Sequence, residues 1–240
     1  MADAKPVAVM DPADTHLTIV GVGGTDGFLA ANAARLLWGL KQQREAAHAE
    51  PCLAHPAFGG PSPENVPDVL LVDGDLVERR NVVRQDFRPS DIGRPKALVL
   101  AERMSPYALN VSECLLYLNA GTPFRELVPK GAIVVGCVDN AATRRILHER
   151  LLGYRDVVYH DASNGAVKPL GDGATRVEAG RQRESGWSGQ VVCGGRRRGE
   201  TIVPFPGDVM PDLLEGDEPE YMAPDKVPCH AVVESQPSAS

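Results

Sequence analysis

The sequence predicts an α/β protein with a doubly wound, mostly parallel sheet and an irregular, partly β C-terminal extension. Three observations support this fold class. Short apolar runs alternate with helical segments as far as residue 161. A glycine-rich turn joins the first apolar run to the helix that follows it. Glycine and proline, with 24 and 20 residues in the chain, then crowd the last third and predict loops there.

The first two thirds of the chain supply the parallel strands and their helices. Strands that are buried on both faces of a sheet have continuous apolar sequences. Such runs predict strands over 17–22, 68–73, 112–118, 131–138 and 156–160. Stretches between them predict helices over 28–40, 96–104 and 141–152. This order of elements is typical of a Rossmann-like fold.

The composition excludes several classes of protein. Apolar residues make up 43% of the 240 residues, enough for a core and too many for wholesale disorder. No apolar run approaches the roughly eighteen residues of a membrane helix, and the N-terminus lacks the apolar segment of a signal peptide. The five cysteines form no CxxC pair, so neither a disulfide framework nor a zinc ribbon is indicated. With a net charge of −7, we expect a cytoplasmic protein without nucleic-acid or membrane partners.

The glycine turn predicts a phosphate-binding site. Gly21, Gly23 and Gly24 lie between the first predicted strand and its helix, where glycine lets backbone N–H groups approach a phosphate closely. Turns of this kind also occur where a strand merely packs tightly on a helix. Asp26 stands where a dinucleotide fingerprint has its third glycine, and its carboxylate would repel phosphates unless a metal intervened. Asp26 is equally suited to cap the helix.

Polar residues follow the second predicted strand, where an acidic side chain usually holds ribose hydroxyls. Asp73-Gly-Asp75 ends this strand, and Asn81-Val-Val-Arg84-Gln85 follows within ten positions. Lys96 closes the segment Asp91-Ile-Gly93-Arg-Pro-Lys96. Arginine and lysine neutralise triphosphate oxygens, arginine through a bidentate fork.

A second polar group follows the fourth predicted strand. Asp139 and Asn140 lie at its end, with Arg144 one helical turn further on. Mg²⁺ prefers carboxylates together with phosphate oxygens, so Asp139 is the candidate metal ligand. Carboxyl ends of parallel strands meet at one edge of a sheet, which predicts that both polar groups surround one phosphate cradle.

Each of these residues also has a structural interpretation. Asp73 and Asp75 would simply cap a loop, and Arg84 would pair with Asp86 or Asp91 on the surface. Lys96 would be a solvated helix residue, and Asn140 an ordinary helix cap that also allows Asp139 to bind metal.

The combination of GxGG, DxD, NxxRQ, DIGxxK and CxDN resembles the ThiF/MoeB/HesA family, bacterial relatives of ubiquitin-activating enzymes, over about residues 16–161. The insert before the second strand, DIGRPKALVLAERM and QVVCGG are similar to ThiF-type proteins of the plasmid-borne PRTRC system. The resemblance implies a ThiF-type adenylyltransferase that uses ATP and Mg²⁺. Its substrate would be the C-terminal carboxylate of a ubiquitin-like or sulfur-carrier protein, with pyrophosphate released. A homodimer is also implied.

By matching positions, the resemblance assigns catalytic roles to Arg84, Lys96 and Asp139, with Asp139 also holding the metal. It assigns nucleotide binding to the other matched residues, which are Gly21, Gly23, Gly24, Asp73, Asn81, Gln85, Asn140 and Arg144. Relatives that form a thioester use a cysteine beyond the core, for which Cys193 and Cys229 are candidates. Cys193 also fits a small buried residue of a strand.

The expected organisation has four parts: an N-terminal tail at 1–15, an adenylation core at 16–165, an extension at 166–230 and a disordered tail at 231–240. Within the core, residues 51–67 form a loop insert and 74–92 are irregular. Within the extension, strands are expected near 189–194 and 201–203, without a strong helix.

Two other functions stay open. A nucleotide-binding or interaction protein of the same fold would carry these residues without turnover, and Asp26 and the short tail favour it. A nicotinamide oxidoreductase leaves NxxRQ and DIGxxK unexplained. A hydrolytic triad around His160-Asp161 lacks the nucleophile motif GxSxG.

Overall fold

The computed structural model describes residues 15–48, 68–104, 110–119, 121–164, 175 and 189–215. The loop insert expected at 51–67, Cys229 and the tail expected at 231–240 lie outside these residues. No helix within the described residues has the length and apolar character to cross a membrane.

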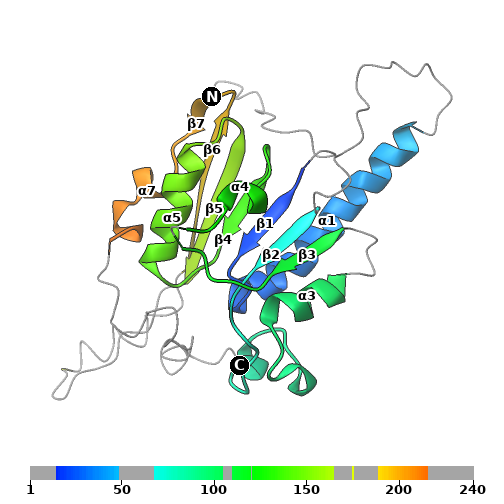
Figure 1. The fold of residues 1–240 in the computed structure, drawn as a ribbon. Helices are drawn as coiled ribbons and strands as arrows, with labels where there is room; N and C mark the ends of the chain where they lie inside the picture. The colour runs from blue at the N-terminus through cyan, green and yellow to red at the C-terminus, as the bar shows by residue number, and fades with distance from the viewer. Residues whose placement is uncertain are drawn as a thin grey trace.

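A seven-stranded sheet in the order β3-β2-β1-β4-β5-β6-β7 forms the centre of the molecule (Figure 1). The strands are β1 (Leu17–Val20), β2 (Val69–Val72), β3 (Val111–Cys114), β4 (Ile133–Gly136), β5 (Val157–Asn164), β6 (Gly189–Arg197) and β7 (Glu200–Val203). The first five are parallel to one another, whereas β6 and β7 are antiparallel to their neighbours. This mixed, mostly parallel sheet confirms the predicted fold class.

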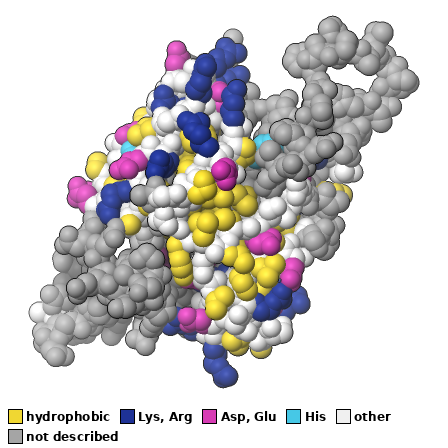
Figure 2. Space-filling view, in the orientation of Figure 1, with side chains coloured by type: hydrophobic (Ala, Val, Ile, Leu, Met, Phe, Trp, Pro, Cys, Tyr) yellow, Lys and Arg dark blue, Asp and Glu magenta, His cyan; other side chains and the backbone are white. Residues whose placement is uncertain are grey.

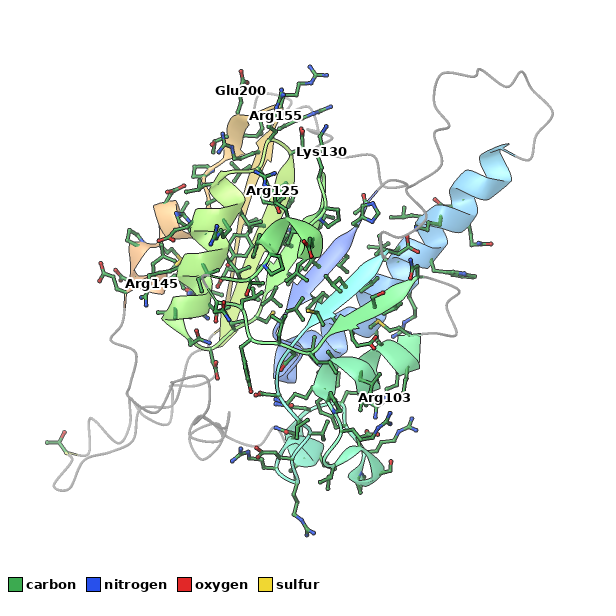
Figure 3. The ribbon with its side chains drawn as sticks, viewed as in Figure 1. Arg103, Arg125, Lys130, Arg145, Arg155 and Glu200 are labelled. Atoms are coloured by element: carbon green, nitrogen blue, oxygen red, sulfur yellow. The ribbon has the colours of Figure 1, made fainter. Side chains whose placement is uncertain are left out.

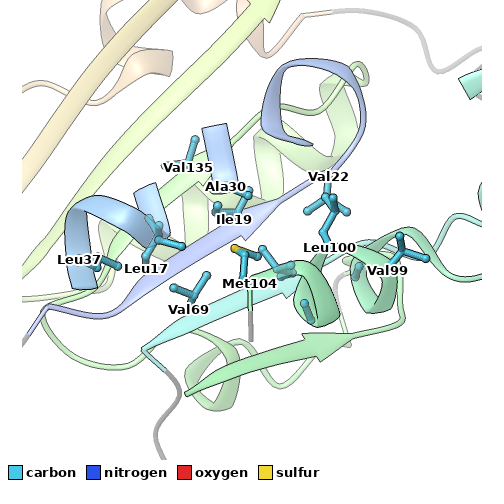
Figure 4. Packing of buried hydrophobic residues seen from close by; sticks show 14 of the residues in the cluster. Leu17, Ile19, Val22, Ala30, Leu37, Val69, Val99, Leu100, Met104 and Val135 are labelled. Carbon is cyan, nitrogen blue, oxygen red and sulfur yellow. The ribbon is translucent and has the colours of Figure 1, made fainter. Parts of the chain in front are cut away.

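Helices cover the parallel strands on both faces. One apolar cluster packs α1 (Gly24–His48) and α3 (Lys96–Met104) against β1 and β2, with Ile19 and Leu71 fully buried (Figure 4). A second cluster packs α4 (Phe124–Leu127) and α5 (Ala141–Leu152) against the other face. Every second residue of a strand faces the same side, so a four-residue apolar strand serves both clusters.

The C-terminal extension is anchored in the second cluster. After β7 the chain turns into two short helices, α7 (Pro206–Val209) and η4 (Pro211–Leu213). Phe205 is fully buried and packs against Tyr159 with ring centroids 6.3 Å apart. Gly194 makes room for it, because a Cβ at this position would lie 2.6 Å from the Cα of Phe205. Within residues 189–215, the helices are confined to these short turns.

Several element boundaries differ from the prediction. Helix α1 begins four residues earlier and ends eight residues later than expected, because lysine, glutamine, glutamate and alanine after residue 40 are strong helix formers. Strand β3 stops at Cys114, short of the expected 118. Residues 74–92, which were expected to be irregular, contain α2 (Asn81–Arg84) and the 3₁₀ turn η2 (Pro89–Asp91).

Candidate nucleotide site at the carboxyl edge of the sheet

Four parallel strands, β1 to β4, end in register and define the edge at which the predicted site residues gather. Val20 pairs with Val72 on one side and with Gly136 on the other. Gly136 in turn pairs with Asp161 of β5. In open α/β sheets this carboxyl edge is where ligands bind.

The glycine turn leaves β1 at this edge. Gly21 has φ of +84°, and a Cβ there would lie 2.9 Å from the carbonyl oxygen of Cys137, so only glycine fits without strain. Gly23 follows, and Gly24 is the first residue of α1. Asp26 therefore lies inside the first helical turn, and its interpretation as the N-cap is wrong. Its side chain is outside the described part of the structure.

Asp73 holds the glycine turn to the end of β2. Its carboxylate oxygens accept hydrogen bonds from the backbone N–H groups of Val22 and Asp75, both at 2.7 Å. Burial raises the pKa of Asp73 to about 6; the nearby Asp75 carboxylate adds to this rise, while Lys96 and the two N–H donors oppose it. Asp73 thus shapes the turn, and its oxygens retain lone pairs for a further donor.

Lys96 is paired at the same edge. Its side chain is 1% exposed, and its Nζ lies 2.7 Å from Oδ2 of Asp75. The hydroxyl of Tyr117 donates to the other oxygen of Asp75. The interpretation of Lys96 as a solvated helix residue is therefore wrong, because it places a fixed positive charge inside the edge. The turn of Tyr117 towards Asp75 accompanies the early end of β3.

Helix α2 brings two buried amides beside the glycine turn. Asn81 is 1% exposed; its Oδ1 accepts a bond from the N–H of Glu78, while its Nδ2 has no partner. Gln85 is also buried, and its Oε1 has no partner. A Cβ at Gly23 would lie 3.6 Å from Nε2 of Gln85, which places this amide against the turn. Buried polar atoms are nearly always satisfied. Other buried atoms of the described residues also lack a hydrogen-bond partner, but these two belong to the amides beside the glycine turn, which makes them the candidate ligand contacts.

Arg103, which the sequence analysis did not single out, anchors the segment that carries these amides. It pairs with Asp91, donates to the backbone carbonyl of Asp86 and lies 5.9 Å above the ring of Phe87. Asp91 is thus engaged by Arg103, and Asp86 lies 3.7 Å from the same guanidinium. Arg84 ends α2, and its side chain is outside the described part of the structure.

The segment after β4 presents Asp139 at the edge. Asp139 is exposed and makes no hydrogen bond or ion pair within the described residues. Asn140 caps α5, because its side chain accepts the N–H of Thr143 at 2.8 Å, which bears out the cap interpretation. Its remaining side-chain atoms stay available for a nucleotide.

The side chain of Arg144 turns inward, away from solvent. Its Nε lies 3.3 Å from Oδ1 of Asp161, and its Nη2 donates to the backbone carbonyl of Val138. Asp161 is 1% exposed and accepts the hydroxyl of Tyr159 at 2.8 Å. Burial, and secondarily the Asp161 carboxylate, hold the pKa of Tyr159 well above its usual range. A signal for Asp161 existed in the sequence, namely an acid directly after the last predicted parallel strand at 156–160, although β5 itself continues to Asn164.

Cys193 is exposed, so its interpretation as a small buried strand residue is wrong. It is the cross-strand partner of His160, and Nδ1 of His160 lies 2.8 Å from its sulfur. Burial lowers the pKa of His160, which favours the neutral imidazole. The sequence placed His160 beside Asp161 and missed its pairing with Cys193 through the β5–β6 register.

A magnesium ion fits this edge only with the help of a nucleotide. The described residues contain no group of three or more histidine, cysteine, aspartate or glutamate side chains that would hold a metal alone. Mg²⁺ commonly binds through one or two carboxylates plus substrate phosphates and water. A single unpaired Asp139 beside a phosphate cradle matches that donor set.

The opposite, amino edge of the sheet has a different character. A cavity of about 490 Å³ lies between α4 and the end of α5, lined by charged side chains of both signs and by Tyr154. Arg125, Lys130 and Arg155 lie together at this end of the molecule (Figure 3), where Figure 2 shows lysine and arginine gathering. Arg125 stacks 5.3 Å above the Tyr154 ring. This cavity lacks the glycine turn and strand-end carboxylates, so it is not the candidate nucleotide site.

The fold and this edge define a class: α/β proteins with a doubly wound sheet and a candidate nucleotide site where the parallel strands end. The chain belongs to the ThiF family, because the family model matches residues 66–191, more than half of the chain.

Solved structures similar to this chain include two of Escherichia coli MccB and one of PaaA. MccB with ATP has 20% identity and a TM-score of 0.45, covering 64% of this chain and 38% of that one. MccB with SeMet MccA has 17% identity and a TM-score of 0.46, covering 73% and 49%. PaaA has 17% identity and a TM-score of 0.43, covering 63% and 38%. This chain spans less than half the length of these solved chains.

Proposed function

We propose that this protein is an ATP-dependent adenylating enzyme that activates the C-terminal carboxylate of a small ubiquitin-like or sulfur-carrier protein. Membership in the ThiF family implies this chemistry. The observation that carries the proposal is the pair of unpartnered buried amides, Asn81 and Gln85, beside a glycine turn at the carboxyl edge. An N–H donor and backbone amides of a glycine turn together suit phosphate oxygens.

In the proposed reaction a carboxylate oxygen of the carrier attacks the α-phosphorus of ATP. A bond from phosphorus to oxygen forms, the bond to the bridging oxygen breaks, and pyrophosphate leaves with that electron pair. The carboxylate is already ionised at pH 7, so the site needs no general base. The chain has to position the two reactants and stabilise the charge on the α-phosphoryl group.

The residues of the edge divide this work. The glycine turn, shaped by Asp73, and the amides of Asn81 and Gln85 bind the nucleotide. Arg84 and Lys96 supply positive charge for the α-phosphoryl oxygens, Lys96 from a position that Asp75 fixes. Asp139 would hold Mg²⁺, which when bound screens the phosphate charges.

Titration calorimetry with ATP and with NAD⁺, each with Mg²⁺ and with EDTA, tests nucleotide choice. We expect ATP to bind more tightly than NAD⁺ and to weaken in EDTA. Tighter NAD⁺ binding, or ATP binding indifferent to EDTA, would contradict the proposal.

Carrier-dependent exchange of pyrophosphate into ATP tests turnover. Because Arg84 and Asp139 stabilise transition-state charge, Arg84→Ala and Asp139→Ala should each lower exchange by about a hundredfold without loss of fold. The first carrier to seek is a small β-grasp protein ending in Gly-Gly in a neighbouring reading frame. Near wild-type exchange in both variants would assign these residues a structural role.

The second candidate function is nucleotide binding without turnover. The ion pair that buries Lys96 against Asp75 favours it, because a lysine 1% exposed has little freedom to follow a moving phosphate. ATP binding without exchange in the presence of the adjacent carrier would select it. The closer likeness to PRTRC-system proteins, and a homodimer, are part of the same proposal and are tested by gene context and by sedimentation.

A further inference from the structure

A buried polar cluster joins three elements behind the segment that carries Asp139. Asp161 comes from the middle of β5, level with the last residue of β4, Arg144 from the first turn of α5, and the carbonyl of Val138 from the segment after β4. Tyr159, also of β5, donates its hydroxyl to the second oxygen of Asp161. One guanidinium therefore bridges a side chain of β5 and the backbone of the segment after β4.

The side chains of the cluster have little freedom to do anything else. The side chain of Asp161 is 2% exposed and that of Arg144 is 12% exposed. A guanidinium is planar and carries its donors in a fixed fork, so one hydrogen bond to Val138 together with an ion pair to Asp161 restricts its orientation. A carboxylate this deeply buried is costly unless it is paired, which ties Arg144 to Asp161.

We propose that Asp161 is a positioning residue, which through Arg144 fixes residues 137–140 and thereby the place of Asp139 at the edge. Arg144 then acts on the backbone of Val138, one residue before Asp139, and not as a ligand of phosphate. The segment is also held at its two ends. The N–H of Cys137 bonds to the carbonyl of Val20 at 3.0 Å, and Asn140 caps α5.

The part of the proposal that concerns metal and nucleotide rests on the proposed function, whereas the anchoring of the segment does not. Hydrogen exchange resolved by residue reads the anchoring without any ligand. The reporters are the bonded amides at the two ends of the segment, those of Cys137, Thr143 and Arg144. Amides of α5 beyond residue 146 serve as an internal reference within each sample.

Asp161→Asn keeps the shape of the side chain and removes its charge. We expect it to speed exchange at the three reporters by about tenfold or more, with the reference amides unchanged. Asp68→Asn is the matched control, because Asp68 pairs with Lys41 and lies before β2 at the opposite edge. Equal exchange in wild type and Asp161→Asn, or the same response in Asp68→Asn, would overturn the proposal.

Arg144→Lys keeps the proposal testable if Asp161→Asn fails to fold. Lysine retains the charge opposite Asp161 and loses the fork that reaches Val138. Faster exchange at the same reporters supports the anchor, and unchanged exchange refutes it.

Calorimetry then tests whether the contact of Asp161 with Arg144 affects nucleotide binding. In Asp161→Asn the Mg²⁺ concentration needed for half-maximal ATP binding should rise about tenfold, while ATP affinity in EDTA stays as in wild type. An equal loss with and without Mg²⁺ would overturn the connection to Asp139. If wild type binds no ATP, the proposed function fails, and the exchange data still decide whether Asp161 anchors the segment.

Discussion

Two polar clusters lie at the same edge of one sheet, and they differ in whether their unbonded buried atoms face an opposite charge within the described residues. On the β2 side, Nδ2 of Asn81 and Oε1 of Gln85 are buried and unpartnered. On the β5 side, Asp161 meets Arg144 at 3.3 Å and accepts the Tyr159 hydroxyl. Nε of Arg144 and Oδ1 of Asp161 also make no hydrogen bond, but they face each other as an ion pair, whereas the two amide atoms have no hydrogen-bond partner in the described residues. We therefore call the first cluster open and the second closed.

This difference distinguishes residues that are suited to bind a ligand from residues that hold the backbone in place. A buried amide without a partner costs free energy that a ligand recovers when it supplies the missing bond. A buried carboxylate with a charged partner helps to fix the arrangement of the backbone. Its removal leaves the partner buried without a counter-charge. The open cluster is therefore the better candidate for contact with nucleotide, although the motif pattern alone gave Asn81, Gln85 and Arg144 the same role.

The largest expected effect concerns stability. Asp161→Ala should lower the free energy of unfolding by about 3–5 kcal/mol, because it leaves Arg144 buried without its counter-charge. Gln85→Met keeps the side-chain volume, removes an unsatisfied oxygen, and should change stability by less than about 1 kcal/mol. Urea unfolding of both variants measures the contrast. Equal losses would mean that the two clusters do not differ.

The next effect concerns affinity. Asn81→Asp retains the acceptor for the N–H of Glu78 but replaces the free donor with a negative charge. ATP affinity should fall by about 2–3 kcal/mol, which is roughly 30- to 150-fold. Asn32→Asp, the same change on the exposed surface of α1, is the control and should bind as wild type. Unchanged ATP binding in Asn81→Asp would remove the open cluster from the site.

A third prediction concerns pH. Because the folded pKa of Asp73, about 6, exceeds its ordinary value of 3.8, the folded state binds more protons between these values. The contribution of Asp73 to stability should therefore fall as pH rises from about 4 to 6. Carbon-13 NMR of the Asp73 carboxyl group should titrate near 6, and Lys96→Met should raise that pKa by about one further unit. A midpoint near 4 in both proteins would contradict the assigned environment.

The smallest effect concerns the thiol of Cys193 on β6, which belongs to neither cluster. Nδ1 of His160 lies 2.8 Å from the exposed sulfur of Cys193, whereas Cys114 is partly buried and its pKa is raised by burial, so iodoacetamide should modify Cys193 several-fold faster than Cys114. His160→Phe should remove most of this advantage, as peptide mass spectrometry would show. Equal rates at the two cysteines of wild type would show that the imidazole does not activate the thiol.

Local sequence patterns predicted most of the fold. Apolar runs located the five parallel strands, and the helices at 96–104 and 141–152 have the predicted bounds. Strand β3 ended early because Tyr117 turns to Asp75, a contact 42 residues apart that no local pattern contains. The short α2 was missed because four residues are too few for a helical period.

The sequence predicted which residues belong to the candidate site better than it predicted which groups those residues contact. The motifs brought Gly21, Asp73 and Gln85 to one edge, because strand ends meet there whatever lies between them. Whether Arg144 faces outward or inward depends on Asp161, which lies on another strand. Pairing across strands depends on register, and register is a property of the folded sheet.

Hydrogen exchange of the wild-type chain with and without ATP and Mg²⁺ tests the central claim most directly, because it locates the nucleotide without assuming turnover. The account predicts slower exchange upon ATP binding at the glycine turn (21–24), in α2 and in residues 137–140, with no change in β7. Protection that falls instead on the cavity between α4 and α5, or protection nowhere in the chain, would contradict a nucleotide site at the carboxyl edge.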